Sequence, residues 1–244
     1  MPEVLSASDV VGGSFWLLST TMIAASFFFL MERKVVAAKW HTSVTLAGVV
    51  TLIAAVQYFY MRDLWLSTGT APIIMRYLDW MLSFPLQVVM FYVVLAALRP
   101  VSAALFWRLL VGALVMIIPQ FLGAAGYMSP TLGFLIGMVG WLYILGELYM
   151  GEAGKANAQS ENKNLNIAFN SLRLIVTIGW AIYPLGYFIE HLGGGVEVNS
   201  LNIIFNLADF LNKLVFGLVV YRLAIKDTRE GEGHANSTSI QPAE

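Results

Sequence analysis

Lys213 and Asp209 are the only charged residues in the apolar stretch from Ser200 to Tyr221. Residues four apart lie on one face of a helix, so the amine and the carboxylate are expected to meet. An amine deprived of water holds its proton less tightly, and the neutral amine is the form that condenses with an aldehyde. The pair therefore predicts an attachment site for a carbonyl compound, since ionisable residues within such segments mark function. The alternative is a buried ion pair that serves packing alone, which seldom stabilises a protein.

A second polar set lies in the apolar segment from Ala71 to Leu98, at spacings of three, four and seven residues. Its members are Arg76, Asp79, Ser83 and Met90. These spacings place them along one helix stripe, with Arg76 outermost and Met90 furthest in. Asp79 can take up a proton and Ser83 can donate a hydrogen bond to it, whereas Met90 can neither hold nor release a proton. The stripe predicts a proton path with a gap at Met90; a structural salt bridge near the outer mouth is the alternative.

Aromatic residues accompany both polar sets. They are Trp80, Trp141, Tyr143, Trp180 and Tyr183. Singly, such rings are usually core or interface anchors, but together they are suited to wall a slot for a long flat polyene. Pro85 and Pro184 each remove a backbone hydrogen bond and are expected to kink their helices.

The elements that must position these residues are membrane helices. Hydrophobic residues make up 58% of the 244 residues and charged residues 12%. Apolar runs of roughly 18 to 28 residues, the length of a membrane-spanning helix, follow one another along the chain. There are seven: Ser14 to Met31, Thr42 to Met61, Ala71 to Leu98, Val101 to Met128, Thr131 to Met150, Ile167 to Ile189 and Ser200 to Tyr221. The predicted fold class is an all-α membrane protein, a seven-transmembrane-helix bundle.

The distribution of basic residues predicts the orientation. Lysine and arginine concentrate in the connections after the first, third and fifth runs and after the seventh, whereas the opposite connections carry only Arg62. Positive residues stay in the cytoplasm, so the N-terminus is expected outside and the C-terminus inside. Residues 1–226 are predicted to form one transmembrane domain, and residues 227–244 a disordered cytoplasmic tail. The polar connection from Gly151 to Asn166 is also expected to be mobile.

Several functions are excluded by composition. The net charge of −1 argues against a nucleic-acid partner. The chain has no cysteine, which rules out disulfides and thiolate sites, and its three scattered histidines have no metal-ligand spacing.

Three motifs identify a family. MRYLDWMLSFPLQ in the third run, GWAIYPLGYF in the sixth and NLADFLNKLVFG in the seventh resemble the microbial rhodopsins, and the proteorhodopsin branch in particular. The resemblance covers nearly the whole chain. It implies that Lys213 carries all-trans retinal as a protonated Schiff base, that Asp79 and Asp209 are counterions with Asp79 the proton acceptor, and that Arg76 is an extracellular gate. The retinal pocket that it implies consists of Trp80, Gln87, Trp141, Trp180, Tyr183 and Pro184.

The departures from the family pattern bear on mechanism. Met90 stands where outward pumps place a carboxylic acid that returns a proton from the cytoplasm. Gln57 replaces the histidine that pairs with the acceptor carboxylate, and Ser83 replaces a threonine. Gln87 occupies the colour-tuning position, where an amide accompanies blue-green absorption and leucine accompanies green. Phe134 replaces a glycine of carotenoid-carrying relatives, so no carotenoid antenna is expected.

Other charged residues have simpler interpretations as helix-end or surface charges. Glu147 is expected to be a solvated helix-end charge. Glu190 and His191, at the outer end of the sixth run, are candidates for a proton-release or metal-sensitive site. The alternative is a solvent-exposed pair with no such role.

The expected activity is light-driven outward proton transport, not enzymatic catalysis, with a cycle favoured by acid because Met90 supplies no proton. A slow-cycling photosensor and an inward proton pump remain alternatives, as does a retinal-free transporter if the match at Lys213 is accidental. Chloride pumping is disfavoured by Asp79, and sodium pumping by the lack of its motif. The resemblance further implies a multi-pass protein of a bacterial inner membrane that forms a homo-pentamer or homo-hexamer in the lipid bilayer.

Overall fold

The computed structural model describes residues 8–191, 193 and 197–239. The helices are α1 (Val10–Glu32), α2 (His41–Thr68), α3 (Ile73–Ala96), α4 (Ala103–Ala124), α5 (Pro130–Tyr149), α6 (Glu152–Ala158), α7 (Lys163–Leu174), α8 (Ile182–His191), α9 (Val198–Asp209) and α10 (Phe216–Ser239). A 3₁₀ turn (Ala38–Trp40) precedes α2, and π-helical turns join α7 towards α8 (Ile175–Gly179) and α9 to α10 (Phe210–Val215).

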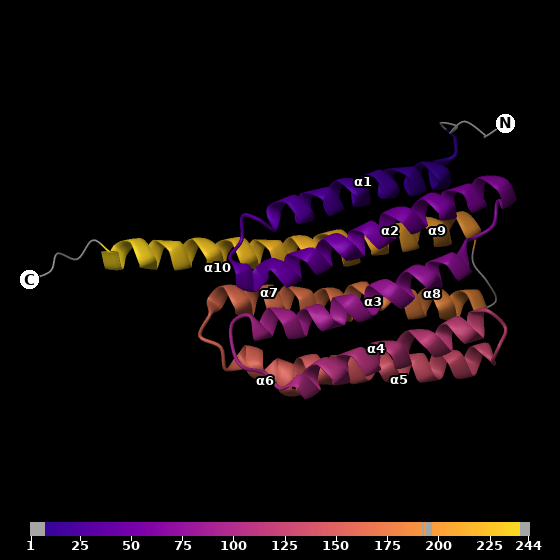
Figure 1. Cartoon of the computed structure of the whole chain (residues 1–244). Helices are drawn as coiled ribbons and strands as arrows, with labels where there is room; N and C mark the ends of the chain where they lie inside the picture. The colour runs from indigo at the N-terminus through magenta and orange to yellow at the C-terminus, as the bar shows by residue number, and fades with distance from the viewer. Residues whose placement is uncertain (1–7, 192, 194–196, 240–244) are drawn as a thin grey trace, which may run out of the picture.

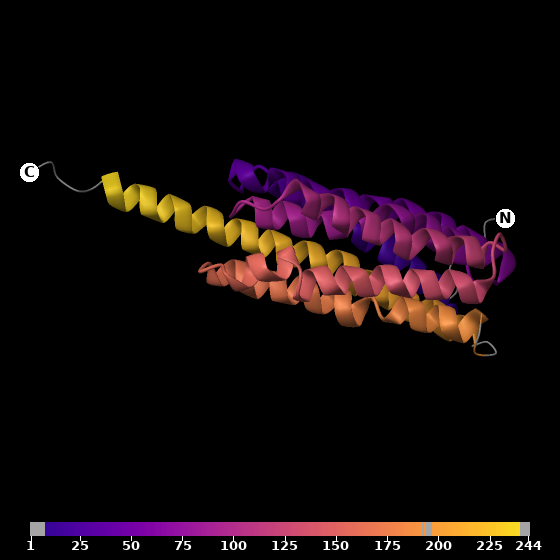
Figure 2. The same ribbon diagram turned by 90° about the horizontal axis from the view of Figure 1, so that it is seen from below.

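These elements form a bundle of long helices that run side by side (Figures 1 and 2). The described residues contain seven spans long and apolar enough to cross a membrane, and no strand. Each predicted apolar run lies largely within one span, because a lipid-exposed backbone can satisfy its polar groups only within a helix or a closed barrel. The predicted fold class is confirmed, while the orientation across the membrane stays a prediction.

Glycines on α5 set the distance to α4. A Cβ added at Gly133 would lie 2.4 Å from the carbonyl oxygen of Pro119. A Cβ added at Gly140 would lie 2.5 Å from the backbone nitrogen of Met116. Both contacts are closer than real Cβ atoms tolerate, so the absence of side chains lets the two backbones approach. The pair forms one edge of the bundle (Figure 1).

The sixth and seventh spans each contain a π-helical turn, and these turns are bonded to side chains of other helices. In the sixth span the carbonyl of Val176 accepts a hydrogen bond from Trp141 Nε1 at 3.1 Å, and the carbonyl of Gly179 accepts one from Asn212 Nδ2 at 3.0 Å. In the seventh, the carbonyl of Asn212 accepts a hydrogen bond from Gln87 Nε2. A π turn leaves carbonyl groups without their usual helical partners, so these side chains are what makes it tolerable inside a membrane.

The last helix extends beyond the predicted boundary at residue 226, since α10 continues to Ser239. Asp227 accepts a hydrogen bond from Trp40 Nε1 at 2.8 Å and pairs with Lys39 at 2.7 Å. Thr228 Oγ1 accepts one from the backbone nitrogen of Ala37 at 2.9 Å. The start of the predicted tail is therefore packed against the connection before α2, which composition alone did not reveal.

The connection from Gly151 to Asn166 also differs from the expectation of one mobile segment. It contains α6 and the first turn of α7, and Ala153 and Asn157 of α6 are buried. The Asn162 side chain caps α7 by accepting a hydrogen bond from the backbone nitrogen of Leu165 at 2.9 Å.

Candidate functional site

The predicted amine and both predicted carboxylates meet in the middle of the bundle. Lys213 lies within the π turn that joins α9 to α10, and Asp209 lies one turn before it. Lys213 Nζ donates to Asp79 Oδ2 and, at 3.1 Å, to Asp209 Oδ2. All three side chains are fully excluded from solvent. Helix α3 therefore places the carboxylate of Asp79 beside the amine of Lys213 on the seventh span.

Arg76 completes a charge set without touching either carboxylate. Its guanidinium donates to Tyr58 Oη at 3.2 Å, and Tyr58 in turn donates to Asp209 Oδ2 at 2.6 Å. Two positive and two negative side chains are thus buried together. This balance is the physical reason that four ionisable groups can lie inside an apolar bundle, where an unpaired charge would be very costly.

The two carboxylates have different environments. Asp209 accepts hydrogen bonds from Tyr58, from Trp80 Nε1 at 3.1 Å, from Tyr183 Oη at 2.6 Å and from Lys213. Asp79 accepts only from Lys213, and its Oδ1 is buried with no partner within the described part of the chain. Donors stabilise the anion, so a proton leaving the amine is accommodated more readily on Asp79.

On the N-terminal side of α3 the polar groups continue beyond Arg76. Its Nη2 donates to Asn206 Oδ1 at 2.7 Å and to Asn202 Oδ1 at 3.0 Å. Asn206 Nδ2 then donates to Ser14 Oγ at 2.7 Å, in the second turn of α1. Hydrogen-bonding side chains therefore lead from Lys213 toward the end of the bundle where α1 and α9 begin (Figure 1).

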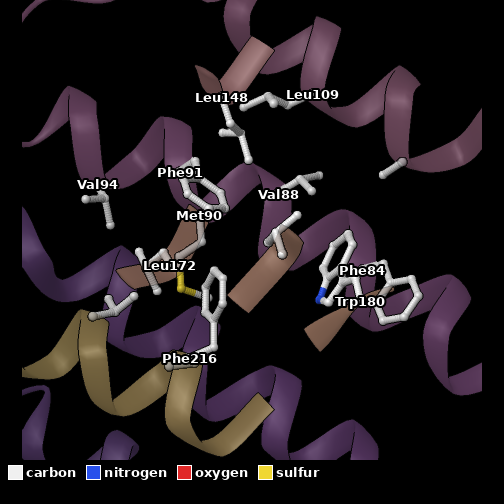
Figure 3. Packing of buried hydrophobic residues seen from close by; sticks show 14 of the residues in the cluster. Phe84, Val88, Met90, Phe91, Val94, Leu109, Leu148, Leu172, Trp180 and Phe216 are labelled. Carbon is white, nitrogen blue, oxygen red and sulfur yellow. The ribbon is translucent and has the colours of Figure 1, made fainter. Parts of the chain in front are cut away.

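The opposite side of Lys213 is apolar. Met90 is 1% exposed and lies beside Phe91, Leu172 and Phe216 (Figure 3). The ring of Phe91 packs against those of Phe216 and Phe169, with centroids 5.8 and 5.4 Å apart. No member of this apolar cluster can carry a proton, so the neighbours of Met90 offer no substitute for a proton-carrying side chain at this position.

An aromatic pocket adjoins the charge set. It is lined by Trp80, Phe84, Met116, Ile117, Gln120, Met138, Trp141, Trp180, Tyr183 and Pro184. Phe84 stacks on Trp180 with centroids 4.5 Å apart. Trp80 and Tyr183 belong to both structures, since each lines the pocket and donates to Asp209. The pocket therefore adjoins the charge set through Trp80 and Tyr183, and its lining suits a flat apolar molecule.

Comparison with known proteins identifies the family of this chain. A family model described as bacteriorhodopsin-like protein matches residues 10–227. A blue-light absorbing proteorhodopsin of Gamma-proteobacterium Hot 75m4 is 50% identical over 226 residues, which make up 92% of this chain and 90% of the relative. A green-light absorbing proteorhodopsin of Gamma-proteobacterium EBAC31A08 is 45% identical over 225 residues, with the same coverage. The crystal structure of a blue light-absorbing proteorhodopsin from Med12 is 43% identical with a TM-score of 0.77, over 90% of this chain and 100% of that one.

The chain belongs to the microbial rhodopsin family. It is proteorhodopsin-like and a multi-pass membrane protein.

The rhodopsin family implies a retinal chromophore, and the residues around Lys213 fit one. A buried primary amine is the group that can bind an aldehyde covalently. The lining of the adjoining pocket is almost wholly aromatic or aliphatic, as a polyene requires. Trp180 Nε1 is buried without a hydrogen-bond partner in the described structure. The residues that would hold retinal are therefore Lys213 at one end and the pocket aromatics along its length.

Three predicted residues take positions that the sequence did not indicate. Gln87 is buried and bonds the carbonyl of Asn212, one residue before Lys213, but does not line the aromatic pocket. The Ser83 hydroxyl is buried, yet it forms no hydrogen bond to Asp79. Gln57 is half-buried and makes no hydrogen bond to the charge set, because the neighbouring residue, Tyr58, points inward instead.

Glu147 corrects another expectation. It is only 9% exposed and pairs with Arg108 at 3.2 Å, so it is not a solvated helix-end charge. The side chains of Glu190 and His191 lie outside the described residues, and their predicted role stays a prediction.

The structure adds polar residues that sequence reasoning missed. On the seventh span these are Asn202, Asn206 and Asn212. A signal for the first two was present: Asn202, Asn206, Asp209 and Lys213 are spaced by four, three and four residues, which places them on one helix face. Tyr58 carried no such signal, because an aromatic residue in an apolar run is indistinguishable from a packing residue.

Gly179→Ala is expected to destabilise this rhodopsin. A Cβ at Gly179 would lie 1.9 Å from Asn212 Oδ1, between the two π turns. Overpacking of this kind costs about 1–3 kcal/mol, which thermal unfolding would show as a lower midpoint. Gly146→Ala is the matched control, since its Cβ would meet nothing within 4 Å. Equal midpoints for the two variants would contradict the close contact, and Asn212→Ala should relieve the defect of Gly179→Ala.

Proposed function

We propose that this protein is a light-driven outward proton pump that carries all-trans retinal on Lys213. The observation that carries the proposal is the unequal bonding of the two carboxylates that flank the buried amine. Asp79, with one donor, is suited to accept a proton, whereas Asp209, with four, is suited to remain a fixed anion. Bound to Lys213 as a protonated Schiff base, retinal supplies light absorption and a light-driven isomerisation.

The chain's own residues give the transfer its direction. A proton that leaves Lys213 Nζ meets Asp79, which is within hydrogen-bonding reach. From the neighbouring carboxylate, Asp209, a polar route runs through Tyr58, Arg76, Asn206 and Ser14 toward the N-terminal end of α1. By the distribution of basic residues that end faces outward. The apolar cluster around Met90 opposes movement of the proton the other way.

The return proton must cross this apolar cluster from the cytoplasmic side. Because Met90 has no exchangeable proton, we infer that the proton arrives through water rather than from a fixed internal acid. The rate of return then follows the proton concentration in the cytoplasm, and pumping is favoured at acidic pH.

The decisive experiment is the light-induced pH change in a suspension of cells that express the protein and have been supplied with retinal. Outward pumping acidifies the medium, and a protonophore abolishes the change. Alkalinisation that the protonophore abolishes would instead establish inward pumping. A bleachable pigment with no pH change under bright light would establish a photosensor, and lack of any visible absorption band would reject the retinal assignment.

Gln87→Leu is expected to move the absorption maximum to longer wavelength. The Gln87 amide bonds the carbonyl next to Lys213, and removing this dipole changes the field at the charged end of the chromophore. Gln120→Leu is the control, because it deletes a pocket amide that bonds neither Asn212 nor Lys213, and its shift should be smaller. An unchanged spectrum in Gln87→Leu would mean that its amide does not act on the chromophore.

The same proposal includes the membrane, the oligomeric state and the lack of an antenna pigment. We place it in a bacterial inner membrane as a homo-pentamer or homo-hexamer, as the proteorhodopsin likeness suggests. Phe134, which stands where carotenoid-carrying relatives have glycine, stacks on Tyr187 with centroids 5.9 Å apart. We therefore expect no antenna pigment, which can be checked by mixing the pigment with carotenoid and looking for energy transfer.

A further inference from the structure

Helices α4 and α5 carry a groove on the outside of the bundle, on the face turned to lipid. The groove has a volume of about 450 Å³ and is lined by Trp107, Arg108, Val111, Gly112, Val115, Val139, Gly140 and Tyr143. Its walls are exposed, with Val139 64% and Trp107 61% accessible. Gly140 and Gly112 form its floor, since they let the helices approach closely and leave no side chain there.

A second, polar groove begins where the first one ends. It has a volume of about 520 Å³ and is lined by Arg99, Pro100, Val101, Arg108, Glu152, Lys155, Ala156 and Gln159. Arg108 lines both grooves, so they adjoin at this side chain. The polar groove lies where α6 crosses the ends of α3, α4 and α5 (Figure 1).

The charges of this region leave one cation in excess. Arg108 pairs with Glu147 at 3.2 Å and with Glu152 at 2.5 Å. Arg99 donates only to the carbonyl of Ala156, and its buried Nε has no partner in the described structure. Lys155 is exposed and forms no ion pair with a described residue. The region thus contains three cationic side chains and two carboxylates. The single negative charge of a phosphodiester would neutralise the one excess positive charge.

We propose that this composite groove binds one anionic phospholipid. Its phosphate lies between Arg108, Lys155 and Arg99, and one acyl chain lies along the apolar groove between α4 and α5. Shape and charge both match such a lipid. An apolar slot that faces lipid adjoins, at Arg108, a basic pocket at the end of the helices, and arginine and lysine near the membrane surface bind lipid phosphate. A second copy of this chain would offer no reason for the unpaired positive charge.

The test uses the full-length protein in detergent after removal of native lipid. Phosphatidylglycerol and phosphatidylcholine with the same acyl chains are added in turn, and native mass spectrometry counts the lipid retained while thermal unfolding gives the midpoint. We expect one phosphatidylglycerol per polypeptide and a larger rise in midpoint than phosphatidylcholine gives. Lys155→Gln should reduce retention of phosphatidylglycerol by about fivefold, the loss expected for one lysine near an anionic headgroup. Val139→Trp should block the slot and reduce retention of both lipids.

Two surface variants serve as matched controls. Lys163→Gln removes a lysine of α7 that lies outside the groove, and Leu135→Trp adds a tryptophan one turn from Val139 at a position that is also exposed to lipid. Both should retain lipid as the native protein does. Equal retention of the two lipids, or a full effect from inorganic phosphate or glycerol phosphate alone, would overturn the proposal. A change of oligomer mass in Val139→Trp would show that a second copy occupies the groove instead.

Discussion

Lys213→Arg is expected to give a folded protein that stays colourless when all-trans retinal is added. Arginine keeps the positive charge between Asp79 and Asp209, so the buried charge set stays balanced. A guanidinium is always protonated and does not condense with an aldehyde, so covalent attachment is lost completely. Visible absorption, and borohydride reduction followed by mass spectrometry, measure the attachment, and circular dichroism measures the helical content.

Lys213→Ala should be equally colourless but less stable, because it leaves two buried carboxylates opposite Arg76 alone. Losing one partner of a buried ion set costs about 3–5 kcal/mol. Lys226→Arg serves as the control, since it changes an exposed lysine of α10 outside the buried charge set and should bind retinal normally. A retinal adduct on another lysine in Lys213→Arg would refute the assignment of the attachment site.

Met90→Glu is expected to accelerate recovery of the resting absorption after a flash and to make it less dependent on pH. If the return proton arrives from the cytoplasm through water, as proposed, native recovery waits for it, and the rate should fall by up to about tenfold for each unit of rising pH. A glutamate within the apolar cluster of Phe91, Leu172 and Phe216 would be held protonated before light, because burial disfavours its anion. It would then supply the proton from within the protein.

Met90→Gln separates this effect from the change of shape. Glutamine has the size and polarity of glutamate but cannot donate an acidic proton, so its recovery should keep the native pH dependence. Flash photolysis at a series of pH values measures all three proteins. Native recovery that is already fast and flat between about pH 5 and 9 would show that another group donates the proton. Glu147, which pairs with Arg108, would then be examined first.

The sequence by itself determined the parts of this protein that depend on local pattern. The seven spans follow from long apolar runs, and the meeting of Lys213 with Asp209 follows from their spacing on one helix. The lack of a proton donor at Met90 was also predictable, because a thioether has no exchangeable proton whichever way the side chain points. In each case the residues involved lie on one segment, and helix periodicity fixes their relation.

Only the tertiary structure decided how the two carboxylates differ. The donors that hold Asp209 come from α2, α3 and the sixth span, and which of the neighbours Gln57 and Tyr58 points inward depends on the rotation of α2 about its own axis. The pairing of Glu147 with Arg108 and the continuation of α10 past residue 226 likewise depend on contacts between segments far apart in sequence. Hydrogen bonds between helices are fixed by how closely and at what rotation the helices pack, and no spacing within a single helix encodes either quantity.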